Sequence, residues 1–490
     1  MKKIQQIYLF ALLLIGSSLH INAQQKITAD LDKIIATAQS GSPDALVAES
    51  RLVNSKWRNI AFQSGFKPQL RLNATLPDLN RSINRINLPN GTVNFLSQSF
   101  MSTDLGISLR QVIKSTGGVV SVGSSFSRLD QFETDISPYN RSYLTNPISL
   151  FIDQPLFGFN AFKWNEKAND LDFESSQKEY VEERENIAYE SVNNFFNLYV
   201  TGIRLENAKR NKAYLDSLDL IAEGRFSVGR IAETEMLQVK LGSKNASAQV
   251  SQLELDLQLQ TEALRDFLGI TEEVLFDLVP PSDPPMYLID TELAVREATN
   301  NRSRTIEFRR RLLTAEREVE ETRRLARPSI SLQGSLGFTG TNTSLGESYQ
   351  NLLDQESIRL SLSIPIADWG LSKAQKETAK SNLELEQFQV TQEQNNFERE
   401  VKVNINQLEL KRKQLILQKE ALEVAELRYD IAKKRYQIGK TDVLDLNAAI
   451  LDQRNSIQEY YNALWSVWEA HYLIRNLTLY DFVEGVSIVY

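Results

Sequence analysis

Few residues of this sequence have the types and spacing that chemistry requires, and the clearest group is acidic. Asp442 and Asp445 are three residues apart, so they would lie on one face at the start of a predicted helix. Glu233 and Glu235 occupy the corresponding place in an earlier segment. Acidic side chains in a first helical turn can serve simply as caps and as partners of the helix dipole. If several chains converge there, the same side chains would form a negative ring that selects cations and can bind a divalent metal.

Residues suited to enzyme catalysis are scarce. The 490 residues include no cysteine and only two histidines, which excludes disulfides, thiolate metal sites and cysteine nucleophiles. His471 lies in a predicted helix between Trp468 and Tyr472, which favours a packed or surface side chain. Thr116-Gly117-Gly118 lacks the lysine and helix of a phosphate loop, so it is predicted to be a hairpin turn. We therefore predict no catalytic residue, cofactor or resident metal, and the net charge of −8 without basic clusters disfavours nucleic acid as a partner.

The segments around the acidic residues occur twice in the chain. Arg225-Phe226-Ser227-Val228-Gly229-Arg230 recurs as Arg435-Tyr436-Gln437-Ile438-Gly439-Lys440. Gln154-Pro155-Leu156 recurs as Ile364-Pro365-Ile366, and the number of residues from proline to glycine is the same in both copies. Two copies that preserve one helix length must keep both helix ends in register. The sequence therefore predicts an internal duplication, and its unit of strands, long helix, glycine turn and second helix suits a wall or a tube.

Long stretches without proline follow Pro155 and Pro365 and are predicted to be helices, at roughly 160–226 and 370–437. At 1.5 Å per residue each would reach on the order of 100 Å, far beyond the average helix of a globular protein. Shorter helices are predicted after the glycine turns, from about 233 to 268 and from about 442 to 477.

Apolar residues form two stripes along the second long helix, each with a spacing of seven residues. The stripes are offset by two residues, about 200° around a helix. One stripe would fit a two-stranded coiled coil, whereas two opposite stripes predict a neighbour on each side, as in a palisade of helices closed into a tube. Burial inside a helical bundle is the alternative, which the charged residues between the stripes disfavour. The first stripe is Val401, Leu408, Leu415, Leu422, Tyr429 and Tyr436, and the second is Val403, Leu410, Leu417, Val424, Ile431 and Ile438.

Strands are predicted before each long helix because apolar and polar residues alternate there. The alternation covers 70–76 and 148–152 in the first copy, and 330–338 and 358–364 in the second. Most of these runs approach the 9–11 residues of a membrane strand. The apolar face would point inward in a soluble sandwich and towards lipid in a membrane barrel, and alternation alone leaves both arrangements open.

The strand region of the first copy, 68–157, is longer than that of the second, 328–366. A predicted hairpin at 103–128 accounts for part of the difference, although its place among the other strands stays open. The polar stretch 79–102 is predicted to be a surface loop. Aromatic residues that follow the strands predict a belt at the membrane surface, with ordinary packing at the strand-to-helix junction as the alternative. These residues are Phe157, Phe159, Phe162, Trp164 and Trp369.

The N-terminus is typical of a secretory signal peptide, with an uncleaved anchor as the alternative. Lys2 and Lys3 precede a short apolar run that ends near Ala23. The domains then follow from the repeats. We expect a signal peptide at 1–23, a first repeat at 24–279 with a helical hairpin at 160–269, a proline-rich linker at 280–289, a second repeat at 290–479 with a helical hairpin at 370–477, and a tail at 480–490.

Taken together, these residues resemble the TolC family of outer-membrane efflux proteins. The resemblance lies in the duplicated unit, in the Arg-Phe/Tyr-x-Val/Ile-Gly turns at 225–229 and 435–439, and in the run Asp442-Val443-Leu444-Asp445. It implies an α+β membrane protein in the form of a trimeric twelve-stranded β-barrel, with four strands from each chain, continued by a long α-helical coiled-coil barrel. It also implies a place among the lipids of the cell outer membrane, with an extension into the periplasm.

The resemblance further implies a passive exit duct for a tripartite efflux or secretion system, served by a periplasmic adapter protein and an inner-membrane transporter. Asp442 and Asp445 match the aspartates of the family's tunnel constriction, and Tyr436 matches a tyrosine that holds the entrance closed. Glu235 has the corresponding place in the first copy. The family's gating arginine has no clear counterpart here beyond Lys440. The turns would dock the adapter, through Arg225, Val228, Gly229, Arg435, Ile438, Gly439 and Lys440.

Two other classes of protein fit the sequence less well. A periplasmic coiled-coil adapter of an export system would need one helical hairpin flanked by domains, not a duplicated unit with two sets of strands. A secreted hydrolase on a β-scaffold would need a constellation of polar residues that this sequence lacks.

Overall fold

A computed structural model describes residues 25–87, 91–133, 138–279, 283–438, 440–441 and 443–489. The predicted signal peptide, Gly439 and Asp442 lie outside these residues. The chain divides into two compact units. The first, here called the sheet unit, comprises Leu52–Gln177 and Ser303–Asn395. The second, here called the helical unit, comprises the chain up to Arg51 together with Lys178–Arg302 and the residues from Asn396 onward.

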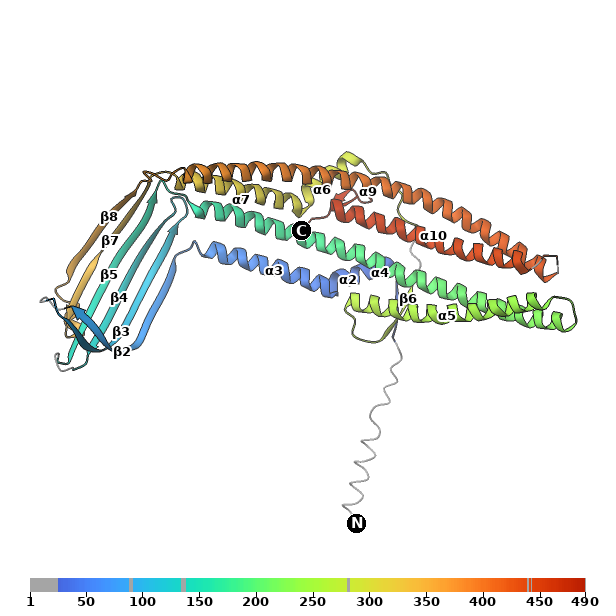
Figure 1. Ribbon diagram of the computed structural model, residues 1–490, viewed down its shortest axis with the longest axis horizontal. Coiled ribbons are helices and arrows are strands. Elements are labelled where there is room, and N and C mark those ends of the chain that lie inside the picture. The colour runs from blue at the N-terminus through green and yellow to red at the C-terminus, as the bar shows by residue number, and fades with distance from the viewer. Residues whose placement is uncertain are drawn as a thin grey trace, which may run out of the picture. The chain divides into compact units, whose positions relative to one another are not determined.

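The sheet unit is built on one antiparallel sheet of six strands, in the order β2-β3-β4-β5-β7-β8 (Figure 1). The prediction of four strands in each chain is therefore wrong. The hairpin predicted at 103–128 belongs to β3 and β4, which lie between β2 and β5 and pair with both. The strands are β2 (Gln69–Asn87), β3 (Val93–Ile113), β4 (Gly118–Gln131), β5 (Asn140–Leu156), β7 (Ser329–Asn342) and β8 (Leu353–Ser363).

The stretch 79–102 is also not the predicted loop, because its described residues are mostly strand. The outer parts of β2 and β3 pair with each other from Asp78↔Ser102 to Asn87↔Val93. The pairing of β3 with β4 ends at Phe100. Beyond that point β2 and β3 form a two-stranded ribbon in which apolar side chains such as Ile83 and Phe95 are exposed. A two-stranded ribbon has no covered face, so it leaves no clear alternation in the sequence.

The two faces of the sheet differ in polarity, as the alternating sequence predicted. Residues paired across antiparallel strands share a face. The paired residues Leu70, Leu109, Val122, Leu150 and Leu336 form an apolar row over five strands. The opposite face carries small and polar residues, among them Arg71, Ser108, Gly123 and Ser149. All five residues of the apolar row are exposed, so neither a second sheet nor a helix covers it within the described chain.

The long helices connect to the strands at one end of the sheet. The sheet unit contains most of α3 (Pro43–Ser64), all of α7 (Ser303–Leu325), and the N-terminal parts of α4 (Ala161–Ser227) and α9 (Leu371–Gln437). The short helix α8 (Leu345–Ser348) lies between β7 and β8. It is held by Thr145 of β5, whose Oγ1 donates a hydrogen bond to the carbonyl oxygen of Ser348 at 2.7 Å.

The junction of strands and helices holds the aromatic residues predicted as a membrane belt. Phe157 and Trp369 are exposed and have positive φ angles of 64° and 54°. Phe162 instead packs edge-to-face on Phe66 at 5.9 Å. Phe159 lies beneath the guanidinium of Arg317. Packing at the junction therefore describes Phe159 and Phe162, while Phe157 and Trp369 have the exposure that a belt requires.

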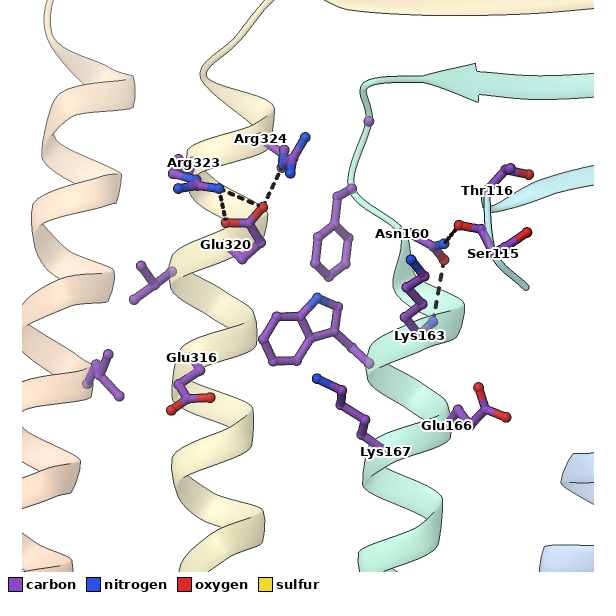
Figure 2. Close-up of a pocket in the computed structure, with 15 residues that line it drawn as sticks. Ser115, Thr116, Asn160, Lys163, Glu166, Lys167, Glu316, Glu320, Arg323 and Arg324 are labelled. Carbon is purple, nitrogen blue, oxygen red and sulfur yellow. Dashed lines mark hydrogen bonds and ion pairs between the residues drawn. The ribbon is translucent and has the colours of Figure 1, made fainter. Parts of the chain in front are cut away.

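A pocket of about 780 Å³ opens beside this junction, between the first turns of α4 and the last turns of α7 (Figure 2). Trp164 and Lys167 line it from α4, with the Lys167 ammonium 5.3 Å from the Trp164 ring centroid. On α7, Glu320 accepts ion pairs from Arg323 at 2.7 Å and Arg324 at 2.6 Å. The charges of Glu320, Arg323 and Arg324 are thus paired within α7.

The helical unit contains the C-terminal parts of α4 and α9 and the helices that return from them, α5 (Glu233–Leu268) and α10 (Val443–Thr478). The predicted helices at 160–226, 233–268, 370–437 and 442–477 are confirmed to within two residues. Helices α4 and α9 have 67 residues each, and α5 and α10 have 36 each. The unit also contains α2 (Leu31–Gly41), α6 (Thr291–Asn301) and the parallel pair β1 (Gln25–Ala29) and β6 (Val274–Leu278).

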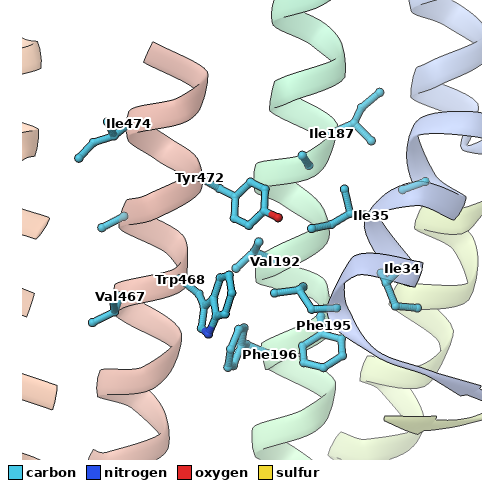
Figure 3. Packing of buried hydrophobic residues seen from close by; sticks show 14 of the residues in the cluster. Ile34, Ile35, Ile187, Val192, Phe195, Phe196, Val467, Trp468, Tyr472 and Ile474 are labelled. Atoms are coloured by element: carbon cyan, nitrogen blue, oxygen red, sulfur yellow. The ribbon is translucent and has the colours of Figure 1, made fainter. Parts of the chain in front are cut away.

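A hydrophobic core joins these helices near the middle of α4 (Figure 3). Phe195 and Phe196 are fully buried and pack edge-to-face at 5.4 Å between ring centroids. Phe196 also stacks on Trp465 of α10. The tail that the sequence left without a structure forms a small hairpin, β9 (Tyr480–Asp481) and β10 (Val486–Ser487). In the described part of the chain, no helix is both long and apolar enough to span a membrane.

Candidate constriction and docking site at the helix turns

Backbone hydrogen bonds stabilise the turn between α4 and α5. The amide of Gly229 donates to the carbonyl of Phe226, and the amide of Arg230 donates to that of Arg225, both at 2.8 Å. This pair of bonds is the Schellman motif, which needs a left-handed residue after the helix. Gly229 supplies it with a φ of 70°. The turn residue singled out in the sequence is therefore glycine for a conformational reason.

The turn between α9 and α10 repeats one of these bonds at the equivalent position. The amide of Lys440 donates to the carbonyl of Arg435 at 2.9 Å, as that of Arg230 does to Arg225. Gly439, which the repeat predicts at the left-handed position, lies outside the described residues. The apolar residues just before the two glycines, Val228 and Ile438, are both exposed. Each turn thus presents one apolar side chain to a possible partner.

Beneath the turns, Tyr436 joins the two helical hairpins. It is 4% exposed and belongs to a cluster with Leu218 of α4, Val239 of α5 and Leu446 of α10. The sequence predicted a role for Tyr436 only from its stripe and from a resemblance. Its partners on α4 and α5 are far away in the chain, and no spacing in the sequence reveals them.

Charged residues of the turns surround the Tyr436 ring. The guanidinium carbon of Arg225 lies 5.5 Å from the ring centroid, within the range of a cation–π contact. Burial raises the pKa of the Tyr436 hydroxyl, Glu235 raises it further, and Arg225 opposes the shift. The phenol is therefore neutral at physiological pH. Arg225, which the sequence assigned to the docking tips, therefore shares one electrostatic environment with Glu235 and Tyr436, which it assigned to the constriction.

Asp445 lies in the first turn of α10 and is exposed. Its Oδ2 accepts a hydrogen bond from Thr441 Oγ1 at 2.8 Å. This bond joins two side chains, and the place of the carboxylate in the first helical turn suits the dipole of α10. Asp442, its predicted companion, lies outside the described residues. Among the residues that the structure describes, no three histidine, cysteine or acidic side chains are grouped to hold a metal ion.

A pocket of about 330 Å³ lies between the end of α9 and the start of α10. Arg428, Arg435, Thr441 and Asp445 contribute its polar lining. Arg428 also forms an ion pair with Asp452 of α10. Sequence reasoning missed this pair, because its members lie 24 residues apart on two helices whose relative rotation no motif reports.

Comparison with known proteins identifies this combination of helices and strands. The sequence model of the outer membrane efflux protein family matches residues 295–476. This part of the chain is therefore similar to the outer membrane efflux protein family. This similarity supports a location in the outer membrane with an extension into the periplasm, and the solved structures that share the fold include outer membrane channels. No curated protein matches the chain.

Solved outer membrane proteins share the fold over nearly the whole chain. The CmeC channel of Campylobacter jejuni superposes with a TM-score of 0.64 at 17% identity, covering 93% of this chain and 88% of that one. VceC of Vibrio cholerae gives 0.63 at 14% identity, covering 91% and 95%. The open state of MtrE from Neisseria gonorrhoeae gives 0.61 at 14% identity, covering 91% and 88%. At these identities the likeness establishes the fold alone.

His471 of α10 is a packing residue. His471 is buried, and its Nδ1 lies 2.6 Å from the hydroxyl oxygen of Tyr287. Burial lowers its pKa to about 4, so the ring is neutral at physiological pH. Arg412 holds the Tyr287 segment by donating to the carbonyl oxygens of Tyr287 at 2.6 Å and Pro285 at 3.0 Å. His471 therefore fastens the proline-rich segment to the helices.

Proposed function

We propose that the protein is the outer-membrane exit duct of a tripartite efflux or secretion system. It would conduct substrate passively from a periplasmic adapter and an inner-membrane transporter to the exterior. We infer that it works as a homotrimer built from an internally duplicated chain, which the paired lengths of α4 with α9 and of α5 with α10 support. The alternative of an adapter is disfavoured, because the chain has two long helical hairpins and a six-stranded sheet.

The observation that carries this proposal is the contrast between the two stripes of α9. Val401, Leu408 and Leu415 of the first stripe are at most 8% exposed and pack in the core of the helical unit. All six residues of the second stripe, from Val403 to Ile438, are between 46 and 68% exposed. Burying such a stripe is favourable by roughly 25 cal/mol for each Å² of apolar surface. The second stripe thus lacks a partner in its own chain.

A second apolar stripe offers the matching contact. Helix α5 exposes Leu237, Leu241, Leu255 and Leu259, each between 50 and 62%. If the α9 stripe of one copy packs on the α5 stripe of the next, two different surfaces meet at every contact. Contacts of this heterologous kind close into a ring when the rotation between copies allows it. A ring of three would surround a duct whose wall is made of these helices.

The turns would then form both the gate and the docking surface. We propose Tyr436, Glu235, Asp445 and Asp442 as the constriction. The buried position of Tyr436 between the hairpins supports this, because separating the hairpins must first release its ring. The adapter would dock on the exposed tips, at Arg225, Val228, Gly229, Arg435, Ile438, Gly439 and Lys440. Opening would spread the hairpins while the helix contacts above the turns slide.

The test is the mass of the detergent-extracted protein, measured by light scattering and corrected for bound detergent. We expect a trimer for the wild type and dissociation for Leu417→Glu/Val424→Glu, because two carboxylates would have to be buried in the contact. Gln394→Glu/Gln437→Glu is the matched control, since it adds the same charge to exposed positions on the side of α9 opposite the stripe and should stay trimeric. A monomer that is soluble without detergent would overturn the proposal.

A further inference from the structure

The sheet ends in two strands that each have one neighbour. Among the described residues, strand β2 pairs with β3 alone and β8 pairs with β7 alone. Strand β8 is exposed at every residue, and most of the described residues of β2 are exposed as well. An edge of this kind presents a row of free backbone N–H and C=O groups. No described segment of the chain covers either edge, so some other chain has to pair with them in a membrane, where free backbone groups cost several kcal/mol each.

The two edges can pair with each other because they run in opposite directions. Every neighbouring pair in the sheet is antiparallel, from β2 with β3 to β7 with β8. In a sheet of six such strands, the first and the last are antiparallel. The β8 edge of one copy can therefore continue the ladder on the β2 edge of the next, with no change in hydrogen-bonding pattern.

The faces also match across such a contact. On β8, Leu360 pairs with Leu332 and Leu362 with Ile330, which places both on the apolar face. On β2, Leu70 and Leu72 lie on the apolar face as well. A continuous apolar outer face and a polar inner face are what a membrane barrel requires. The segment of β2 before its bulge at Thr75/Asp78 is the part that β8 can pair with, since both lie at the helix end of the sheet.

The sheet does not close on itself within one chain, because β2 and β8 do not pair with each other in the part of the chain that the structure describes. We propose that three copies join through their β8 and β2 edges into one barrel of eighteen strands. This inference rests on the proposed trimeric duct and adds the pairing of the edges and the width of the barrel.

The number of strands determines the diameter of the barrel. Barrel diameter grows roughly linearly with strand number, so eighteen strands give a barrel about half again as wide as twelve. Barrels of about 16–18 strands leave an aqueous channel. The extra hairpin β3–β4 would thus widen the exit, because both of its strands belong to the barrel wall and neither folds over the opening.

Disulfide trapping tests the contact directly, since the chain contains no cysteine. Leu72→Cys is combined in turn with Ile358→Cys, Leu360→Cys and Leu362→Cys, and the protein is oxidised in its native membrane. At one of these registers we expect disulfide-linked species up to a trimer, which a reducing agent returns to monomers. A second series on the polar face, Asn73→Cys with Arg359→Cys, Ser361→Cys or Ser363→Cys, repeats the test if a lipid-facing cysteine lowers assembly.

Two control pairs of cysteines show whether a disulfide forms at a known contact and fails to form where no contact exists. Leu150→Cys/Leu336→Cys joins residues paired within one sheet and should give an internal disulfide without linked copies. Leu150→Cys/Leu360→Cys joins residues of non-adjacent strands and should give none. Internal links between β2 and β8, linked dimers as the largest product, or no link in either series would each overturn the eighteen-stranded barrel.

The same samples separate this inference from the duct itself. A trimeric mass in detergent together with failed trapping would refute the barrel while the duct stands. A monomer soluble without detergent would refute both.

Discussion

At the scale of single residues, Tyr436 is the side chain on which the two helical hairpins depend most. Tyr436→Ala removes a buried ring from the cluster beneath the turns. It should lower the free energy of unfolding of the helical hairpins at the turns by about 3–5 kcal/mol. Tyr436→Phe keeps the ring and its contact with Arg225, so it is the matched control. We expect faster tryptic cleavage at the turns and more frequent opening in planar bilayers for the alanine variant only. Equal cleavage of the two variants would contradict a fastening role for the ring.

His471 predicts a pH dependence with a definite sign. Burial lowers its pKa to about 4 in the folded protein, against 6.5 when unfolded. The unfolded state therefore binds the proton first as pH falls, and the stabilising contribution, complete above pH 6.5, is lost between pH 6.5 and 4. Between pH 7 and 5 the free energy of unfolding should fall by about 2 kcal/mol from this group. Urea unfolding in detergent, followed by tryptophan fluorescence, measures it.

The control for this prediction is His471→Gln, which cannot titrate in this range. Its unfolding free energy should be lower than that of the wild type at pH 7, because the bond to Tyr287 is altered. The change in the free energy of unfolding between pH 7 and pH 5 should be smaller than in the wild type by the contribution of His471. An unchanged pH dependence would show that other groups account for it.

At the scale of elements, two glycines occupy equivalent positions after helices. Gly229 and Gly269 both follow a helix with a φ of 70°. A Cβ at Gly229 would meet nothing within 4 Å, whereas one at Gly269 would lie 3.1 Å from Pro43 Cδ and 3.3 Å from the carbonyl oxygen of Gly41. Gly229→Ala should cost about 1–2 kcal/mol for the left-handed backbone. Gly269→Ala should cost more, as measured by thermal loss of the helical circular-dichroism signal. Equal losses would refute the close packing at Gly269.

The long helices could be predicted from the sequence, whereas parts of the sheet and the packing of the hairpins could not. The helices α4 and α9 were predictable, because proline is absent along their length and two heptad stripes mark the C-terminal half of α9. The outer halves of β2 and β3 were not, because a ribbon with both faces exposed carries no alternating pattern. The turn at Gly229 followed from its residue type. The burial of Tyr436 against α4 did not, since it depends on how two distant hairpins pack.

At the scale of the whole molecule, the exposed apolar face of the sheet predicts dependence on detergent. The row from Leu70 to Leu336 is uncovered in the single chain, and surfaces of this size aggregate in water unless lipid or a partner covers them. Removing detergent should precipitate the protein, whereas reconstitution into lipid nanodiscs should keep it monodisperse. Analytical ultracentrifugation in both conditions measures this. A monodisperse species in detergent-free buffer would contradict a membrane-facing sheet.

The equal lengths of the paired helices constrain how this protein can change over generations. Helices α4 and α9 have 67 residues each, and their ends meet at one cluster beneath the turns. Inserting one heptad into α9 alone would advance its turn by about 10 Å and carry Tyr436 away from its partners on α4. A lineage that needs a longer duct must therefore lengthen both halves of the gene by the same amount, and an insertion in one half should be inherited only beside its counterpart in the other.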